Sequence, residues 1–234
     1  MKIAFPILFW CLFSGLTSGQ GTSKNIHFGF SFTPQLGNAA FNSKLVANNH
    51  SGINYLFSGD VLINLSPKTQ FITGLILHDV KLKYRDYSPQ FPGDVENGMA
   101  LIFNSYWDFN YSDLFIGLPV RVKLKLNSPD KLNHFFFKFG LTAQRLLINS
   151  GYVILNESGY IHEKRGPDEY YFDFQKTWLV TNIGLGYEFK LGKGKFSIQP
   201  EYEYSLSKIF RPTIAVDANG RLSFLGIQLA YDIK

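Results

Sequence analysis

Hydrophobic and polar residues alternate one by one along several stretches of this chain. At residues 26 to 33, isoleucine and phenylalanine occupy every second position, and histidine, glycine, serine and threonine fill the positions between them. The clearest stretch, 114 to 126, has leucine, isoleucine and valine on one face and Arg121, Lys123 and Lys125 on the other. A period of two is typical of β-strands, whereas a helix repeats every ~3.6 residues. The pattern therefore predicts strands with one strongly apolar face.

The same alternation predicts about eight strands in all. Besides the two stretches above, they lie at residues 53–63, 69–84, 135–144, 179–190, 196–204 and 225–233. The apolar positions of the stretch 69–84 change phase half-way, so we expect a β-bulge near His78 and Asp79. Pro119 and Pro200 fall inside predicted strands. Because proline lacks the N–H that a ladder needs, each is expected at a bulge or a strand end.

The connections between these strands alternate between short and long. The short ones are 66–68, 127–133 and 192–194, and the long ones are 34–50, 85–111, 149–175 and 209–219. Bacterial outer-membrane barrels join their strands in this way, with short periplasmic turns and long external loops. The layout predicts an all-β fold, an antiparallel up-and-down transmembrane β-barrel of about eight strands with short periplasmic turns and long extracellular loops.

The polar faces of the strands decide which side of the wall points outward. In a membrane barrel the apolar face meets lipid, whereas in a soluble lipocalin-like binding barrel it lines the interior. The polar faces here carry charges of both signs, which favours the membrane barrel. We expect a lumen charge network of Asp60, Arg121, Lys123, Lys125, Lys138, Glu188, Glu201 and Glu203. Such a barrel is only just wide enough for its own side chains, so opposite charges should pair and close the lumen to solutes.

Aromatic residues are unusually frequent, at 17% of the chain, with 23 Phe, 13 Tyr and 3 Trp. This enrichment suits sheet surfaces and membrane interfaces. Aromatic residues gather near the predicted strand ends, which predicts two interfacial girdles. The girdle at the outer rim would contain Trp107, Tyr111 and Trp178, and the girdle at the periplasmic rim Phe189, Phe196 and Tyr231.

The N-terminus has the features of an export signal. A lysine precedes an apolar run at residues 3–13, and small residues follow just before Gln20. These features predict a cleaved signal peptide at 1–19 and a barrel domain at 20–234, located in the bacterial outer membrane. The only cysteine, Cys11, would leave with the signal, so neither disulfides nor thiol chemistry would operate in the mature chain. No later apolar run is long enough for a membrane helix, so insertion would use strands.

Four short segments resemble a known family. They are residues 113–123, 137–141, 182–189 and 228–231, with sequences DLFIGLPVRVK, FKFGL, NIGLGYEF and QLAY. These segments are similar to strands of the small outer-membrane β-barrels of Bacteroidota that are described as PorT-like. The resemblance implies an eight-stranded barrel and participation in secretion or envelope assembly.

Candidate chemistry in the chain is sparse. His78, with Ser105 or Ser112 near it in the predicted topology, is the best candidate for a lipid-modifying outer-membrane enzyme. No nucleophile, base and orienting group can be assembled around these residues, so we predict no catalytic site. His162 and Glu163 have no ligand spacing around them, and we predict neither a metal site nor a cofactor. The formal net charge of +5 is mild and not clustered, which gives no reason to expect nucleic acid as a partner.

The loops hold the charged and aromatic residues that the strand pattern leaves unexplained. A non-enzymatic scaffold, binding or assembly subunit of the envelope, acting through its extracellular loops, is the function that this arrangement favours. The loop contact candidates are Tyr160, Arg165, Tyr170, Tyr171 and Phe172. The expected partners are outer-membrane lipid, lipopolysaccharide and an envelope protein.

Overall fold

The computed structural model describes residues 26–41, 46–86, 107–127, 133–155, 160–165, 176–208 and 220–233. Their regular structure consists of strands, as the sequence pattern predicts. The strands are β1 (Ile26–Phe41), β2 (Val46–Ser51), β3 (Ile53–Asn64), β4 (Thr69–Asp86), β5 (Trp107–Lys125), β6 (His134–Leu155), β7 (Tyr160–Arg165), β8 (Thr177–Leu191), β9 (Gly194–Ser205) and β10 (Gly220–Ile233). In these described ranges no helix is long and apolar enough to cross a membrane. The predicted signal peptide at 1–19 lies outside the described residues.

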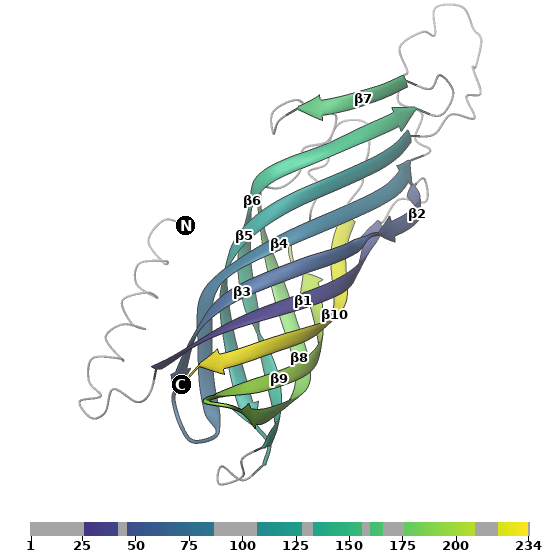
Figure 1. The fold of residues 1–234 in the computed structure, drawn as a ribbon. Coiled ribbons are helices and arrows are strands. Elements are labelled where there is room, and N and C mark those ends of the chain that lie inside the picture. Colours follow the sequence, from purple (N-terminus) through teal and green to yellow (C-terminus); the bar gives the residue numbers. More distant parts are fainter. Residues whose placement is uncertain are drawn as a thin grey trace, which may run out of the picture.

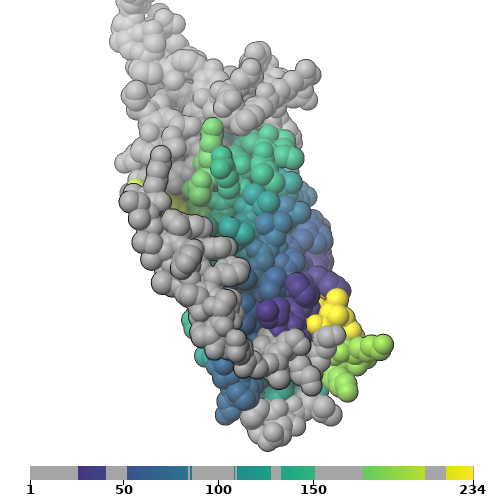
Figure 2. Space-filling view, turned by 90° about the vertical axis from the view of Figure 1, so that its left-hand side faces the viewer, coloured from purple at the N-terminus to yellow at the C-terminus, as the bar shows by residue number. Residues whose placement is uncertain are grey.

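Eight of the strands close into a barrel (Figure 1). Each pairs antiparallel with its neighbours in the order β1, β3, β4, β5, β6, β8, β9, β10. The last strand returns to the first, with pairs that run from Phe28 and Ile233 to Phe41 and Gly220. Figure 2 shows the start of β1 in purple beside the end of β10 in yellow. The predicted eight-stranded antiparallel barrel is therefore confirmed.

Tight turns join the strands at one end of the barrel. Between β3 and β4, the Ser66 hydroxyl accepts hydrogen bonds from the backbone N–H groups of Lys68 and Thr69, at 3.3 and 3.0 Å. Between β8 and β9, Gly192 has a φ of 61°, a conformation that favours glycine. These turns confirm the short connections expected at 66–68 and 192–194. Most of the third, at 127–133, lies outside the described residues.

The strands reach further towards the other end than the alternation indicates. The loops predicted at 34–50, 85–111 and 149–175 are too long, because β1, β5 and β6 extend into them and β2 and β7 lie within them. At this end β4, β5 and β6 rise beyond the barrel, with β2 paired to β4 and β7 paired to β6 (Figure 1). Backbone pairing does not need an apolar face, so a search for apolar alternation ends the strands too early.

The β-bulge expected near His78 and Asp79 is absent. β4 keeps one register with β3, and its register with β5 is also continuous through these residues. The change of phase has another cause: Leu77 points outward, whereas Val80 and Leu82 are buried in the interior. In the barrel wall, the register shifts instead between β5 and β6 at Leu147, and a further shift lies between β2 and β4 beyond Ala47.

The prolines are accommodated without a bulge or a strand end, contrary to expectation. Beside Pro119, the ladder between β4 and β5 lapses from Thr73 to Ile76 and then resumes in the same register. Beside Pro200, the ladder between β8 and β9 lapses in the same way. A proline removes one donor on one side only, so the barrel loses pairing locally while the neighbouring strand on the other side stays paired.

Candidate functional site: the filled interior and the apolar belt

The outer surface of the barrel is apolar. On all eight strands of the wall, large hydrophobic side chains that face away from the interior are exposed or half-exposed. Exposed examples are Phe28, Phe30, Leu36, Phe57, Leu75, Leu118, Phe139, Leu141, Ile183, Leu185, Ile198, Leu225 and Ile227. A soluble protein rarely exposes so large a continuous apolar surface.

The interior, in contrast, is largely polar, and most of its polar side chains are buried. Seven of the eight predicted lumen charges are buried there: Asp60, Arg121, Lys123, Lys138, Glu188, Glu201 and Glu203. Lys125 is only half-buried, near the end of β5. A lipocalin-like soluble barrel would need an apolar interior and a polar exterior, which is the reverse of this distribution. The fold is that of a transmembrane β-barrel.

Solved structures of small outer-membrane proteins resemble this barrel. Neisserial surface protein A matches with a TM-score of 0.41 and 12% identity, over 87% of this chain and 95% of that one. Ail of Yersinia pestis matches with a TM-score of 0.35 and 12% identity, over 89% of this chain and 98% of that one. OprG from Pseudomonas aeruginosa matches with a TM-score of 0.34 and 10% identity, over 89% and 94%. No family model and no curated protein matches the chain.

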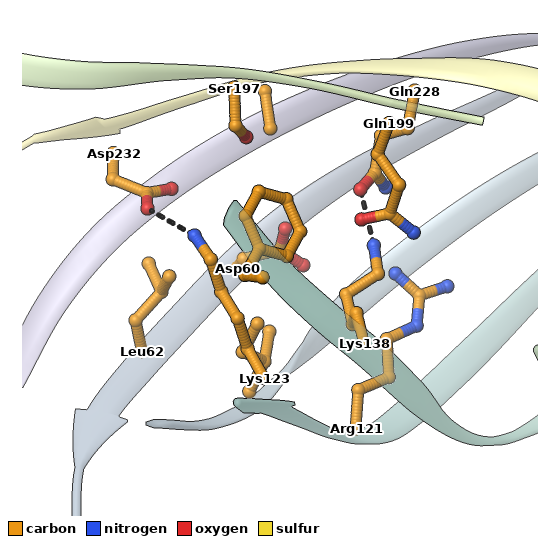
Figure 3. A pocket seen from close by; sticks show the side chains of 12 residues that line it. Asp60, Leu62, Arg121, Lys123, Lys138, Ser197, Gln199, Gln228 and Asp232 are labelled. Atoms are coloured by element: carbon orange, nitrogen blue, oxygen red, sulfur yellow. Dashed lines mark hydrogen bonds and ion pairs between the residues drawn. The ribbon is translucent and has the colours of Figure 1, made fainter. Parts of the chain in front are cut away.

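One group of charges lies towards the end with the tight turns. The Lys123 ammonium donates a hydrogen bond to Glu188 and lies 3.6 Å from a carboxylate oxygen of Asp232 (Figure 3). Lys195 donates to the other Glu188 oxygen at 2.7 Å. The Lys123 ammonium also lies 4.4 Å from the centre of the Phe136 ring. Two carboxylates thus neutralise a lysine that would be very costly to bury alone.

A second group lies further along the interior. The Lys138 ammonium donates to the Gln228 amide oxygen and lies 3.6 Å from Glu201, whose other oxygen accepts from Asn182 at 2.5 Å. Arg121 lies 3.8 Å from Glu203, and Gln35 donates to the same carboxylate at 3.1 Å. The partners come from six different strands. The network therefore ties opposite walls of the barrel together across the lumen.

Glycines on the inner face make room for these long side chains. A Cβ added at Gly184 would lie 2.0 Å from the Gln199 amide nitrogen, and one at Gly186 would lie 2.4 Å from the Phe136 ring. A Cβ at Gly140 would lie 2.4 Å from a backbone oxygen of β5. Gly184 and Gly186 thus leave the space that the Gln199 and Phe136 side chains occupy.

The charged groups nearly fill the space between them. A cavity of about 20 Å³ lies among Leu62, Ile72, Phe136 and the charged side chains of Asp60, Arg121, Lys123, Lys138 and Asp232 (Figure 3). A single water molecule needs roughly 10–15 Å³. This part of the lumen therefore leaves no room for a solute larger than water.

An aromatic layer crosses the interior on the side of the long connections. The Trp178 ring lies 4.8 Å from Phe115 and 6.3 Å from Phe224, and His78 lies 4.9 Å from Phe224. Trp178 and Tyr111 are buried in the interior, so their assignment to an outer girdle is wrong. Aromatic alternation alone does not distinguish the two faces of a wall. Of the third predicted member, Trp107, only the backbone is described.

Aromatic side chains do gather on the outside at the other end. Phe189 and Phe196 lie 5.4 Å apart between ring centres, and Tyr231 lies 5.8 Å from Phe30. All three predicted members of this girdle are half-buried on the outer wall. Towards the long connections, Tyr55 and Tyr204 take the corresponding outward positions, each beside a cation.

The candidate catalytic residues do not come together. His78 is fully buried, and its Nδ1 lies 3.2 Å from the Gln144 amide oxygen. Ser112 lies on the outer side of the wall, where its hydroxyl is 3.5 Å from Asp79. The strand wall therefore separates this pair, and Ser105 lies outside the described residues. No cluster suited to a metal ion occurs among the described residues.

Three of the five loop contact candidates have no described position. Tyr170, Tyr171 and Phe172 lie outside the described residues. Tyr160 and Arg165 are the first and last residues of β7, where the backbone alone is described. His162 and Glu163 belong to the same strand. The structure thus places part of the predicted contact region on a strand that extends the wall at the end with the long connections.

Proposed function

We propose that this chain is a non-enzymatic outer-membrane β-barrel protein that acts as a scaffold, binding or assembly subunit of the envelope through the end that carries its long connections. One observation carries the proposal: an apolar outer belt surrounds an interior that is filled by its own side chains. The belt supports residence in a lipid bilayer, and the filled interior opposes transport through the barrel.

The height of the belt fits a bilayer. On β10 the outward apolar residues run from Leu225 to Ile233, and on β8 they run from Leu179 to Phe189. A tilted strand needs roughly 9–11 residues to cross the hydrocarbon region, and the apolar band of such barrels is about 25 Å tall. Above the belt, outward positions of β4 and β5 become polar, as at the exposed Lys83 and the half-buried Asn110.

The orientation follows from the connections. Tight turns would face the periplasm and the extended strands the outside, as in bacterial barrels generally. The predicted signal peptide and the resemblance to PorT-like barrels of Bacteroidota support the same location and a role in secretion or envelope assembly. With the lumen filled and the candidate His–Ser pair separated by the wall, partner binding is left to the extended end.

A pull-down from native envelope tests this role. A tagged chain that lacks residues 159–168, which include β7, should fold and reach the outer membrane but lose the envelope protein that co-purifies with the full chain. A matched control, K68Q/K190Q/K193Q, removes three exposed cations at the turn end and should retain that protein. Full co-purification after the deletion would contradict binding through this segment, and an isolated full chain would contradict the subunit role.

A further inference from the structure

Cations face outward on both sides of the barrel rim that carries the long connections, but the two sides differ in the acidic residues beside these cations. On β4 and β5, Lys81 lies 3.5 Å from Asp79, and Arg85 makes a two-point ion pair with Asp108 at 2.7 and 3.0 Å. These cations are neutralised by their own neighbours. Further exposed cations lie at the same rim on β6, just after β9 and on β10: Arg145, Lys208 and Arg221.

The strand register brings these three cations close together. Arg145 pairs with Thr177 of β8, and Leu206, two residues before Lys208, donates its N–H to the Leu179 carbonyl oxygen at 2.8 Å. In the same register, Arg221 follows on β10, where its guanidinium donates to the Tyr204 hydroxyl at 3.1 Å. Neighbouring strands lie about 4.8 Å apart, so the cations span a patch on the order of 15 Å wide.

No acidic side chain points outward in this patch among the described residues of β6, β8, β9 and β10 at the rim. Glu203 of β9 points into the lumen and is fully buried. Among the described residues, the patch, which we call the rim cluster (Arg145, Lys208 and Arg221), is therefore a local excess of positive charge.

Apolar side chains surround the rim cluster. Leu179 and Leu206 are exposed next to it on β8 and β9. Beyond Arg145, the bulge in β6 leaves two successive apolar residues exposed. Leu147 and Ile148 are 51% and 58% accessible. Cations next to exposed leucines suit a bilayer interface, because the apolar groups can contact acyl chains while the charges reach the head groups.

We infer that the rim cluster binds the phosphate groups of an anionic lipid in the leaflet that faces the long connections, with the acyl chains against Leu179 and Leu206. Guanidinium and ammonium groups are the side chains that bind phosphate, and each cation near an anionic lipid surface adds about fivefold to binding. The inference rests on the proposed membrane location. Lipid held there would also anchor the wall beside β6, the strand that carries β7.

The test compares two triple variants of the full mature barrel by native mass spectrometry after incubation with diphosphoryl lipid A in detergent. R145Q/K208Q/R221Q removes the rim cluster, and K68Q/K190Q/K193Q removes three exposed cations at the turn end. We expect the first variant to retain lipid A on the order of 100-fold more weakly than the native chain, since three fivefold gains are lost. The second should bind as the native chain does.

Two further measurements separate the possible failures. Flotation with phosphatidylcholine vesicles reports membrane insertion alone: if the native chain does not float, the proposed function fails. If it floats and both triple variants retain lipid A equally, the rim-cluster site is refuted while the membrane location stands. Inorganic phosphate at millimolar concentration should not displace lipid A, and displacement would show a free-anion site instead.

Discussion

Specific hydrogen bonds and ion pairs stabilise the buried charges of the lumen, beyond the overall balance of positive and negative charge. Glu188 accepts hydrogen bonds from Lys123 and Lys195, which come from opposite sides of its own strand, β8, in the barrel wall. A buried ion pair often stabilises a protein no more than apolar residues of the same volume would. Removal of one partner, however, leaves an uncompensated buried charge. The network therefore fixes which side chains meet, and its loss should be costly.

The exchange Glu188→Gln tests this at the residue scale. It removes a carboxylate that is 2% accessible and leaves Lys123 with only Asp232 as an acidic partner. We expect the free energy of unfolding, measured by urea titration in lipid vesicles, to fall by about 3–5 kcal/mol. The control Lys81→Gln breaks an exposed pair and should change it by no more than about 1 kcal/mol. Equal effects of the two exchanges would show that the lumen pairs carry no special weight.

The sequence predicts which residues enter the lumen but not which of them meet. Alternation assigns Arg121, Lys123 and Glu203 to the polar face of their strands, and a face is a property of one strand. Pairing across the lumen depends on the stagger of the strands, which alternation does not contain. Asp232 illustrates the gap: it is on the polar face of the last predicted strand, yet only the closed barrel reveals that it lies beside Lys123.

At the scale of the strand, alternation works best where only one face is apolar. It locates β8 and β9 well, because their inner faces are polar through the lower barrel. It misreads β4, whose apolar residues move from the outer face to the inner face at the level of the aromatic layer. A change of apolar face and a bulge give the same break in phase, so the sequence alone cannot choose between them.

A charge placed on the outer face of β8 tests whether this face contacts lipid. Leu185 is exposed at mid-belt, and Thr177 is exposed at the rim of the same strand. We expect Leu185→Arg to lower stability in lipid vesicles by about 2–4 kcal/mol and Thr177→Arg by about 0–1 kcal/mol, as at the midplane and the interface of a bilayer. Folding equilibria in vesicles measure both. Equal effects at the two depths would be incompatible with a lipid-facing belt.

At the scale of the whole molecule, two layers of side chains fill the closed wall. The ionic network lies towards the tight turns, and the aromatic layer around Trp178 lies towards the long connections. Eight strands give an interior that side chains can just fill, and inner-face glycines let the larger ones interlock. Closure without a free strand edge also protects the wall from pairing with other chains. The surfaces left for contacts with other molecules are the outer belt and the end where β4, β5 and β6 extend beyond the barrel.

The depth of spin labels on the outer wall tests the central claim most directly. The only cysteine of the chain, Cys11, lies in the predicted signal peptide, so single cysteines in the mature barrel can each carry one label. Labels at Leu185 and Ile227, in the belt, should be relaxed by oxygen and shielded from a water-soluble nickel chelate in reconstituted vesicles. A label at Lys83, above the belt, should show the opposite preference. Belt labels that are as accessible to the nickel chelate as the label at Lys83 would contradict a membrane-embedded barrel.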